Sequence, residues 1–179
     1  MRRVNLILVA GMLVTFLLHA IMGALQLAGA NADAQKPVAW ICVGFIAAHT
    51  VVTTILGIQT LRARRKSGAG YFRANQLFWA RRISGAAILI PLVMHLVFFR
   101  ASNAEAYRLQ VFTAGRLISQ LLLVLALALH VLLNVKPLMI ALGVRDTKSF
   151  TTDLMLILSV VLLLAGAAFV VYYLRWLRV

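Results

Sequence analysis

Five long apolar runs dominate this sequence and restrict it to one class of fold. They cover residues 4–29, 38–60, 83–99, 117–142 and 154–174. Each is near or above the roughly 17 residues that a helix needs to cross a bilayer. Because lipid offers no partners to backbone N–H and C=O groups, such a segment crosses as an α-helix. The sequence therefore predicts an all-α integral membrane protein with five transmembrane helices in a single domain, residues 1–179.

The composition excludes the main alternative classes. Hydrophobic residues make up 63% of the 179 residues and charged residues 12%, which is too apolar for a soluble domain. A net charge of +14 would suit a nucleic-acid-binding protein. The basic residues, however, follow the loops between the apolar runs and form no aromatic-studded face. We therefore expect the lipid bilayer as the partner of this surface and no nucleic acid.

The distribution of basic residues predicts how the chain is oriented. Seven of them lie in or beside one loop: Arg62, Arg64, Arg65, Lys66, Arg73, Arg81 and Arg82. The positive-inside rule places that loop, and with it the N-terminus, in the cytoplasm. The first run is long and has no clear small-residue cleavage site, so it is expected to be a retained span of a multi-pass protein. Aromatic residues near the C-terminus are expected to form a belt at the outer interface: Tyr172, Tyr173 and Trp176.

Each of the first four runs carries one histidine, and these are all the histidines in the chain: His19, His49, His95 and His130. An ionisable side chain inside the membrane is expensive to leave unpaired. At about 1.5 Å per residue across a core of about 30 Å, His19 and His95 lie about 23 and 20 Å from the cytoplasmic edge. His49 and His130 lie about 13 and 9 Å from it. The depths predict an outer pair, His19 with His95, and an inner pair, His49 with His130.

Two matched pairs of histidines predict the axial ligands of two b-type haems. Cofactor sites in helical bundles are built from side chains on facing helices, so the first four helices would form the haem-binding bundle. The alternative is that each histidine hydrogen-bonds a neighbouring helix, which explains one histidine better than four at two depths. A zinc site would need cysteine or carboxylate ligands that are missing at these depths. Bis-histidine iron has no open coordination position, which suits electron transfer.

The third run carries the most specific pattern in the sequence. Arg82-Ile83-Ser84-Gly85, with His95 ten residues after the glycine, resembles the R-x-[ST]-G-x9-H pattern of the cytochrome b subunit of succinate dehydrogenase and fumarate reductase complexes. The likeness is to the single-chain, five-helix, two-haem type. His130 with Gly143 thirteen residues on is also similar. Arg81 departs from the family, which often has glutamine at this position.

The resemblance implies a membrane anchor that passes electrons between quinone and an iron–sulfur subunit. That subunit would serve an FAD-containing flavoprotein that interconverts succinate and fumarate, a reaction that this chain would not catalyse by itself. The membrane would be the cytoplasmic membrane of a prokaryote, and the quinone menaquinone rather than ubiquinone. Two alternatives stay open. One is a dihaem subunit of another quinone-linked oxidoreductase, in which ligands cluster on fewer helices; the other is a haem-free membrane scaffold.

Several residues are expected to surround the cofactors. Ser84 and Gly85 lack bulk, so a porphyrin or a neighbouring helix can approach the backbone. Cationic and hydrogen-bonding groups near the inner interface would hold the propionates of the inner haem: Trp79, Arg81, Arg82 and Lys136. For the arginines, contact with lipid headgroups is the alternative. Asp33, in the first outer loop, is the candidate quinone residue, and the basic loop from Arg62 to Arg82 is the candidate docking surface for the iron–sulfur subunit.

Overall fold

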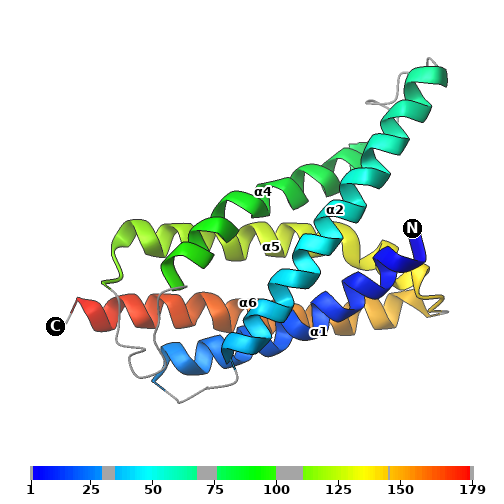
Figure 1. Ribbon diagram of the computed structural model, residues 1–179. Coiled ribbons are helices and arrows are strands. Elements are labelled where there is room, and N and C mark those ends of the chain that lie inside the picture. The colour runs from blue at the N-terminus through cyan, green and yellow to red at the C-terminus, as the bar shows by residue number, and fades with distance from the viewer. Residues whose placement is uncertain (1, 30–34, 68–75, 100–110, 145, 178–179) are drawn as a thin grey trace.

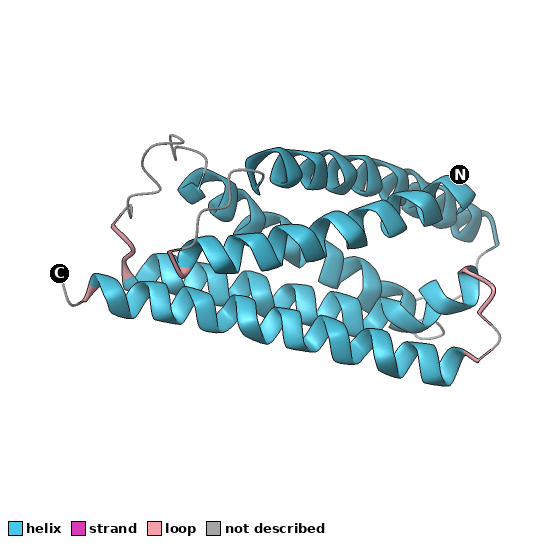
Figure 2. Cartoon of the chain, turned by 90° about the horizontal axis from the view of Figure 1, so that it is seen from below, coloured by secondary structure: helices cyan, strands magenta, loops and turns pink. Residues whose placement is uncertain are grey.

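A computed structural model of the chain describes residues 2–29, 35–67, 76–99, 111–144 and 146–177. These residues form five α-helices, which Figure 2 shows in cyan. The helices are α1 (Arg2–Leu27), α2 (Gln35–Ser67), α4 (Gln76–Phe99), α5 (Ala114–Ala141) and α6 (Thr147–Trp176). All five are long and apolar enough to span a membrane. The predicted class, an all-α membrane protein with five spans, is confirmed.

The helices begin and end at different residues from the apolar runs. α4 begins at Gln76 rather than at residue 83, and α2 continues to Ser67 rather than stopping at residue 60. Hydropathy marks only the part of a helix that lipid surrounds, whereas arginine, lysine and glutamine favour helix beyond it. As a consequence, Trp79, Arg81 and Arg82 lie on α4 and not in the loop before it.

Helix ends carry local signals that the apolar pattern does not show. The side chains of Thr113 and Asp146 accept hydrogen bonds from backbone N–H groups in the first turns of α5 and α6, so each caps its helix. Gly143 follows α5 with φ at 75°, a left-handed conformation that glycine adopts without strain. These signals place the turn between α5 and α6.

The helices pack in a chain of neighbours. α1 packs chiefly against α2 and α6, and α5 chiefly against α4 and α6. α2 crosses the other helices obliquely, and its C-terminal part extends past the bundle (Figure 1). α1 begins at the end of the bundle where α6 also begins, and α6 ends at the opposite end (Figure 1). We call these the N-terminal and C-terminal ends of the bundle.

A cluster of buried side chains lies toward the C-terminal end: Leu27, Phe112, Phe169 and Tyr172. The Tyr172 ring lies 5.1 Å from the Phe112 ring and only 4% of this tyrosine is exposed. The predicted aromatic belt is therefore wrong for Tyr172, which faces the interior, and Tyr173 packs partly against the same cluster. The side chain of Trp176 lies outside the described residues. α6 is apolar on all sides, so its sequence alone does not indicate which face is buried.

Candidate functional site

The four histidines come from four different helices, and the rings of two of them meet. The rings of His19 on α1 and His95 on α4 have centroids 5.9 Å apart, with their planes at 88°. These two are the outer pair that the depths predict, while the inner pair, His49 with His130, stays a prediction. Their role as iron ligands stays a prediction.

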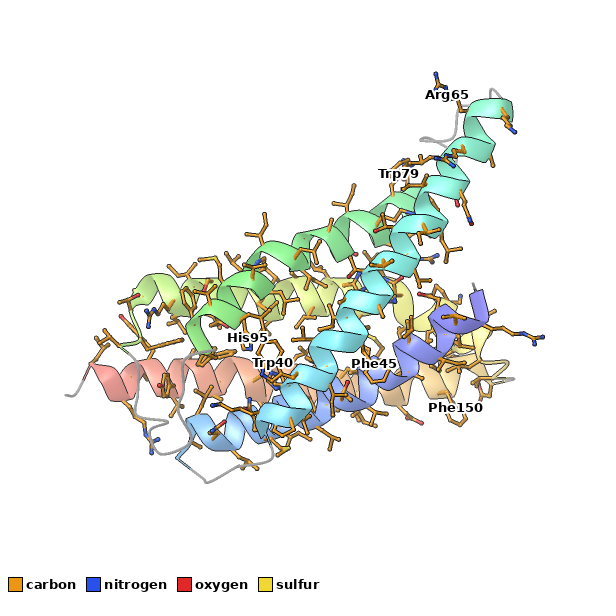
Figure 3. All side chains as sticks on the ribbon, in the orientation of Figure 1. Trp40, Phe45, Arg65, Trp79, His95 and Phe150 are labelled. Atoms are coloured by element: carbon orange, nitrogen blue, oxygen red, sulfur yellow. The ribbon has the colours of Figure 1, made fainter. Side chains whose placement is uncertain are left out.

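His95 is held more closely than the other three. Its Nδ1 lies 2.7 Å from Oε1 of Gln120 on α5, and the Gln120 side chain is completely buried. The ring also lies 5.0 Å from that of Phe99 and 6.4 Å from that of Phe169. Figure 3 shows His95 directed from α4 toward the neighbouring helices. The cluster of buried side chains thus covers one side of the His19–His95 pair.

His130 rests on the Ser84-Gly85 pair of α4. The Ser84 hydroxyl lies 3.0 Å from the carbonyl oxygen of Arg81 and also 3.0 Å from His130 Nδ1, and the amide nitrogen of Asn134 lies 3.4 Å from the same ring nitrogen. A Cβ atom added to Gly85 would lie 3.2 Å from His130 Cε1. The sequence predicts a close approach at these two small residues, and the structure places the imidazole of α5 there.

The other two histidines have weaker partners. The Nδ1 atom of His19 lies 3.4 Å from Nε2 of Gln35, a long contact. The Nδ1 atom of His49 is buried and has no hydrogen-bond partner among the described residues. A buried nitrogen without a partner is costly.

Arg81 and Arg82 connect α4 to the helices on either side of it. Arg81 Nε donates to the Leu133 carbonyl oxygen of α5 at 2.9 Å. Arg82 Nη1 donates to the Thr53 carbonyl oxygen of α2 at 3.1 Å. Gly57 makes the second contact possible, since a Cβ there would lie 2.8 Å from Arg82 Nη1. Both arginines therefore join α4 to its neighbours by hydrogen bonds that need no cofactor.

The remaining predicted residues have other surroundings. The Trp79 ring lies 5.5 Å from that of Phe78, its neighbour on α4, and Lys136 is exposed on α5. Figure 3 shows Arg65 near the tip of α2, away from the bundle. Asp33, the predicted quinone residue, lies outside the described residues. The structure therefore gives no position for the quinone site.

Sequence reasoning missed three buried polar residues that bear on the histidines. They are Gln35, Ser119 and Gln120. The available signal is a Ser-Gln pair inside the apolar run that follows Arg116, because an uncharged polar group at that depth needs a partner. The sequence does not indicate which histidine the pair would meet.

The separation of His19 and His95 fits a metal bound between two imidazoles. Nitrogen–metal bonds of about 2 Å, as histidine makes to zinc, would hold two opposed imidazole centroids roughly 6 Å apart. The centroids of His19 and His95 are 5.9 Å apart. In the part of the chain that the structure describes, no three His, Cys, Asp or Glu side chains could hold one ion together. The His19–His95 pair therefore suits a group that brings its own equatorial ligands, as a haem does, better than a zinc ion.

Comparison with protein-family models, with curated proteins and with solved structures finds no match to this chain. The fold and the composition define a multi-pass membrane protein with five candidate spans.

Proposed function

We propose that this chain is the dihaem cytochrome b membrane anchor of a succinate dehydrogenase or fumarate reductase complex. The observation that carries the proposal is the pairing of histidines from separate helices, with the His19 and His95 centroids 5.9 Å apart. α1 packs chiefly against α2 and α6, so these two side chains meet across the bundle and not along a helix interface. Such an arrangement suits a group bound between the helices.

Each pair would supply both axial ligands of one b-type haem. A haem held by two histidines exchanges single electrons and has no position open for oxygen. Ser84 would orient His130, and Gly85 would leave space for its ring. Arg81 and Arg82 would hold anionic propionate groups beside the His49–His130 pair, since guanidinium groups bind carboxylates through charge-assisted hydrogen bonds. Trp79 and Lys136 are assigned to the same group of contacts.

The partners come from the resemblance of Arg82-Ile83-Ser84-Gly85 and His95 to the family pattern. They are an iron–sulfur subunit, an FAD-containing flavoprotein subunit and a quinone, for which menaquinone is favoured over ubiquinone. Electrons would pass through this chain between the quinone and the iron–sulfur subunit. Asp33 is the proposed quinone residue, and the cytoplasmic membrane of a prokaryote is the proposed location, with the N-terminus inside.

The haem-free scaffold is the alternative that a specific observation favours. Gln120 and Ser84 each satisfy one nitrogen of a histidine without any cofactor. A dihaem subunit of another quinone-linked oxidoreductase would also bind two haems, but its ligands would cluster on fewer helices than the four that carry histidines here.

A reduced-minus-oxidised spectrum of the purified chain tests the proposal. We expect two haems per chain, all removable by acid acetone because none is attached covalently. Replacing His19 or His95 by alanine should remove one haem, and replacing His49 or His130 should remove the other. A chain without visible absorption would refute the proposal and favour the scaffold. If haem is present but histidines of different pairs remove the same haem, the haem assignment stands and the pairing is refuted.

A further inference from the structure

A chain of three hydrogen bonds crosses from α5 to His95 on α4. The Ser119 hydroxyl donates to the Arg116 carbonyl oxygen at 2.8 Å. The amide nitrogen of Gln120 lies 3.0 Å from Ser119 Oγ, and its amide oxygen lies 2.7 Å from His95 Nδ1. Ser119 and Gln120 are 4% and 0% exposed. The two side chains that link the Arg116 carbonyl oxygen to the imidazole are thus enclosed by protein.

The direction of each bond follows from what each atom can do. A backbone carbonyl only accepts, so the single hydroxyl hydrogen of Ser119 is used on Arg116. Ser119 Oγ must then accept from the Gln120 amide nitrogen, which turns the amide oxygen toward His95. Because that oxygen only accepts, His95 Nδ1 carries the hydrogen. A neutral imidazole protonated at Nδ1 has its free lone pair on Nε2.

We infer that Gln120 is a positioning residue for His95, which selects the tautomer able to bind a metal through Nε2. The inference rests on the proposed function, because it gives Gln120 a part in holding a haem. An acceptor behind a ligating histidine fixes the ring and raises the basicity of the ligand. Hydrogen bonding of this kind also tunes the reduction potential of the iron.

The histidine on α5 has a different set of partners. Ser84 on α4 lies 3.0 Å from His130 Nδ1, and the Asn134 amide nitrogen lies 3.4 Å from the same atom. α4 and α5 therefore each contact a histidine of the other helix. Because Gln120 and Ser84 contact different histidines, the two contacts can be perturbed one at a time.

The test is Gln120→Leu in the whole membrane complex, a substitution of similar size that removes the acceptor. A redox titration followed in the haem α-band resolves the two haems, and transfer to apomyoglobin measures how fast each is released. We expect one haem to be released about 10- to 100-fold faster, in line with loss of such an acceptor. The midpoint potential of the same haem should rise, because its histidine becomes a weaker electron donor. Gln120→Glu restores an acceptor and should return release toward the wild-type rate.

Ser84→Ala is the matched control, since it removes the hydroxyl that contacts His130 Nδ1 and should move only the other haem. The inference fails if Gln120→Leu leaves both potentials and both release rates at their wild-type values. It also fails if Gln120→Leu moves the component that Ser84→Ala moves. Should the leucine variant not assemble, Gln120→Asn keeps the amide but draws it back by one methylene and should give the same change. A wild-type complex without haem overturns the proposed function, and the inference with it; haem that Gln120 variants leave unaffected overturns the inference alone.

Discussion

Gly85→Ala should weaken the protein through one contact that the structure defines. The added Cβ would lie 3.2 Å from Cε1 and 3.5 Å from Nδ1 of His130. Carbon atoms pack best at about 3.5–4.0 Å, so the imidazole must move by at least about 0.3 Å. Ser84 Oγ, on the adjacent residue, is bonded to the same nitrogen at 3.0 Å. The ring therefore cannot retreat without stretching that hydrogen bond.

The size of the effect follows from two opposing contributions. Replacing glycine by alanine inside a helix is worth about 0.8–1.0 kcal/mol in water. Overpacking a filled site costs about 1–3 kcal/mol, and a stretched hydrogen bond adds up to about 1 kcal/mol. Gly44→Ala is the matched control, because Gly44 lies within α2 and nothing lies within 4 Å of its Cβ position. The difference between the two variants removes the helix-propensity contribution and should be about 1–4 kcal/mol.

Denaturant unfolding in mild detergent, followed by circular dichroism, measures this difference with or without a cofactor. We expect Gly44→Ala to match or exceed the wild-type stability and Gly85→Ala to fall below it. In the whole complex, Gly85→Ala should also release faster the haem that Ser84→Ala affects. Equal stability of the two glycine variants would refute the packing of His130 on Gly85. Lower stability with unchanged haem release would separate packing from cofactor binding.

Three further predictions follow from the charged residues. Arg82→Leu removes the hydrogen bond to α2 and the stacking of the guanidinium 4.1 Å over the Phe78 ring. It should therefore lower the free energy of unfolding by about 1–3 kcal/mol. Arg65→Leu, on the exposed tip of α2, is the control and should change the free energy of unfolding little. Charge reversal at Arg64, Arg65 and Lys66 should release the proposed iron–sulfur and flavoprotein subunits at lower salt than the wild type, because complementary charge steers and supports docking. Unchanged release in a salt series would limit these residues to setting the membrane topology. No Asp or Glu occurs in the sequences of α1, α2, α4 or α5, so these helices offer no carboxylate relay to carry protons alongside the electrons. Electron transfer to a quinone at the proposed site near Asp33 should therefore be electrogenic, at about 2.3 kcal/mol per charge per 100 mV. A potential-sensitive dye in sealed vesicles measures this, and turnover without any potential would contradict it.

The sequence determined the fold class and the depth of each histidine. Lipid leaves a long apolar run no conformation other than a helix, so five runs predict five spans. A helix rises by a constant distance per residue, so counting places each histidine along the membrane normal. That counting pairs His19 with His95, and the structure places their rings side by side.

Only the tertiary structure decided how each helix is rotated about its axis and what meets it there. α6 is apolar on every face, so nothing in its sequence indicates that Tyr172 turns inward. Gln120 reaches His95 from another helix, and Arg82 reaches the carbonyl oxygen of Thr53 in the same way. These contacts depend on the packing of side chains between helices, because water no longer distinguishes one face of a helix from another inside a bilayer.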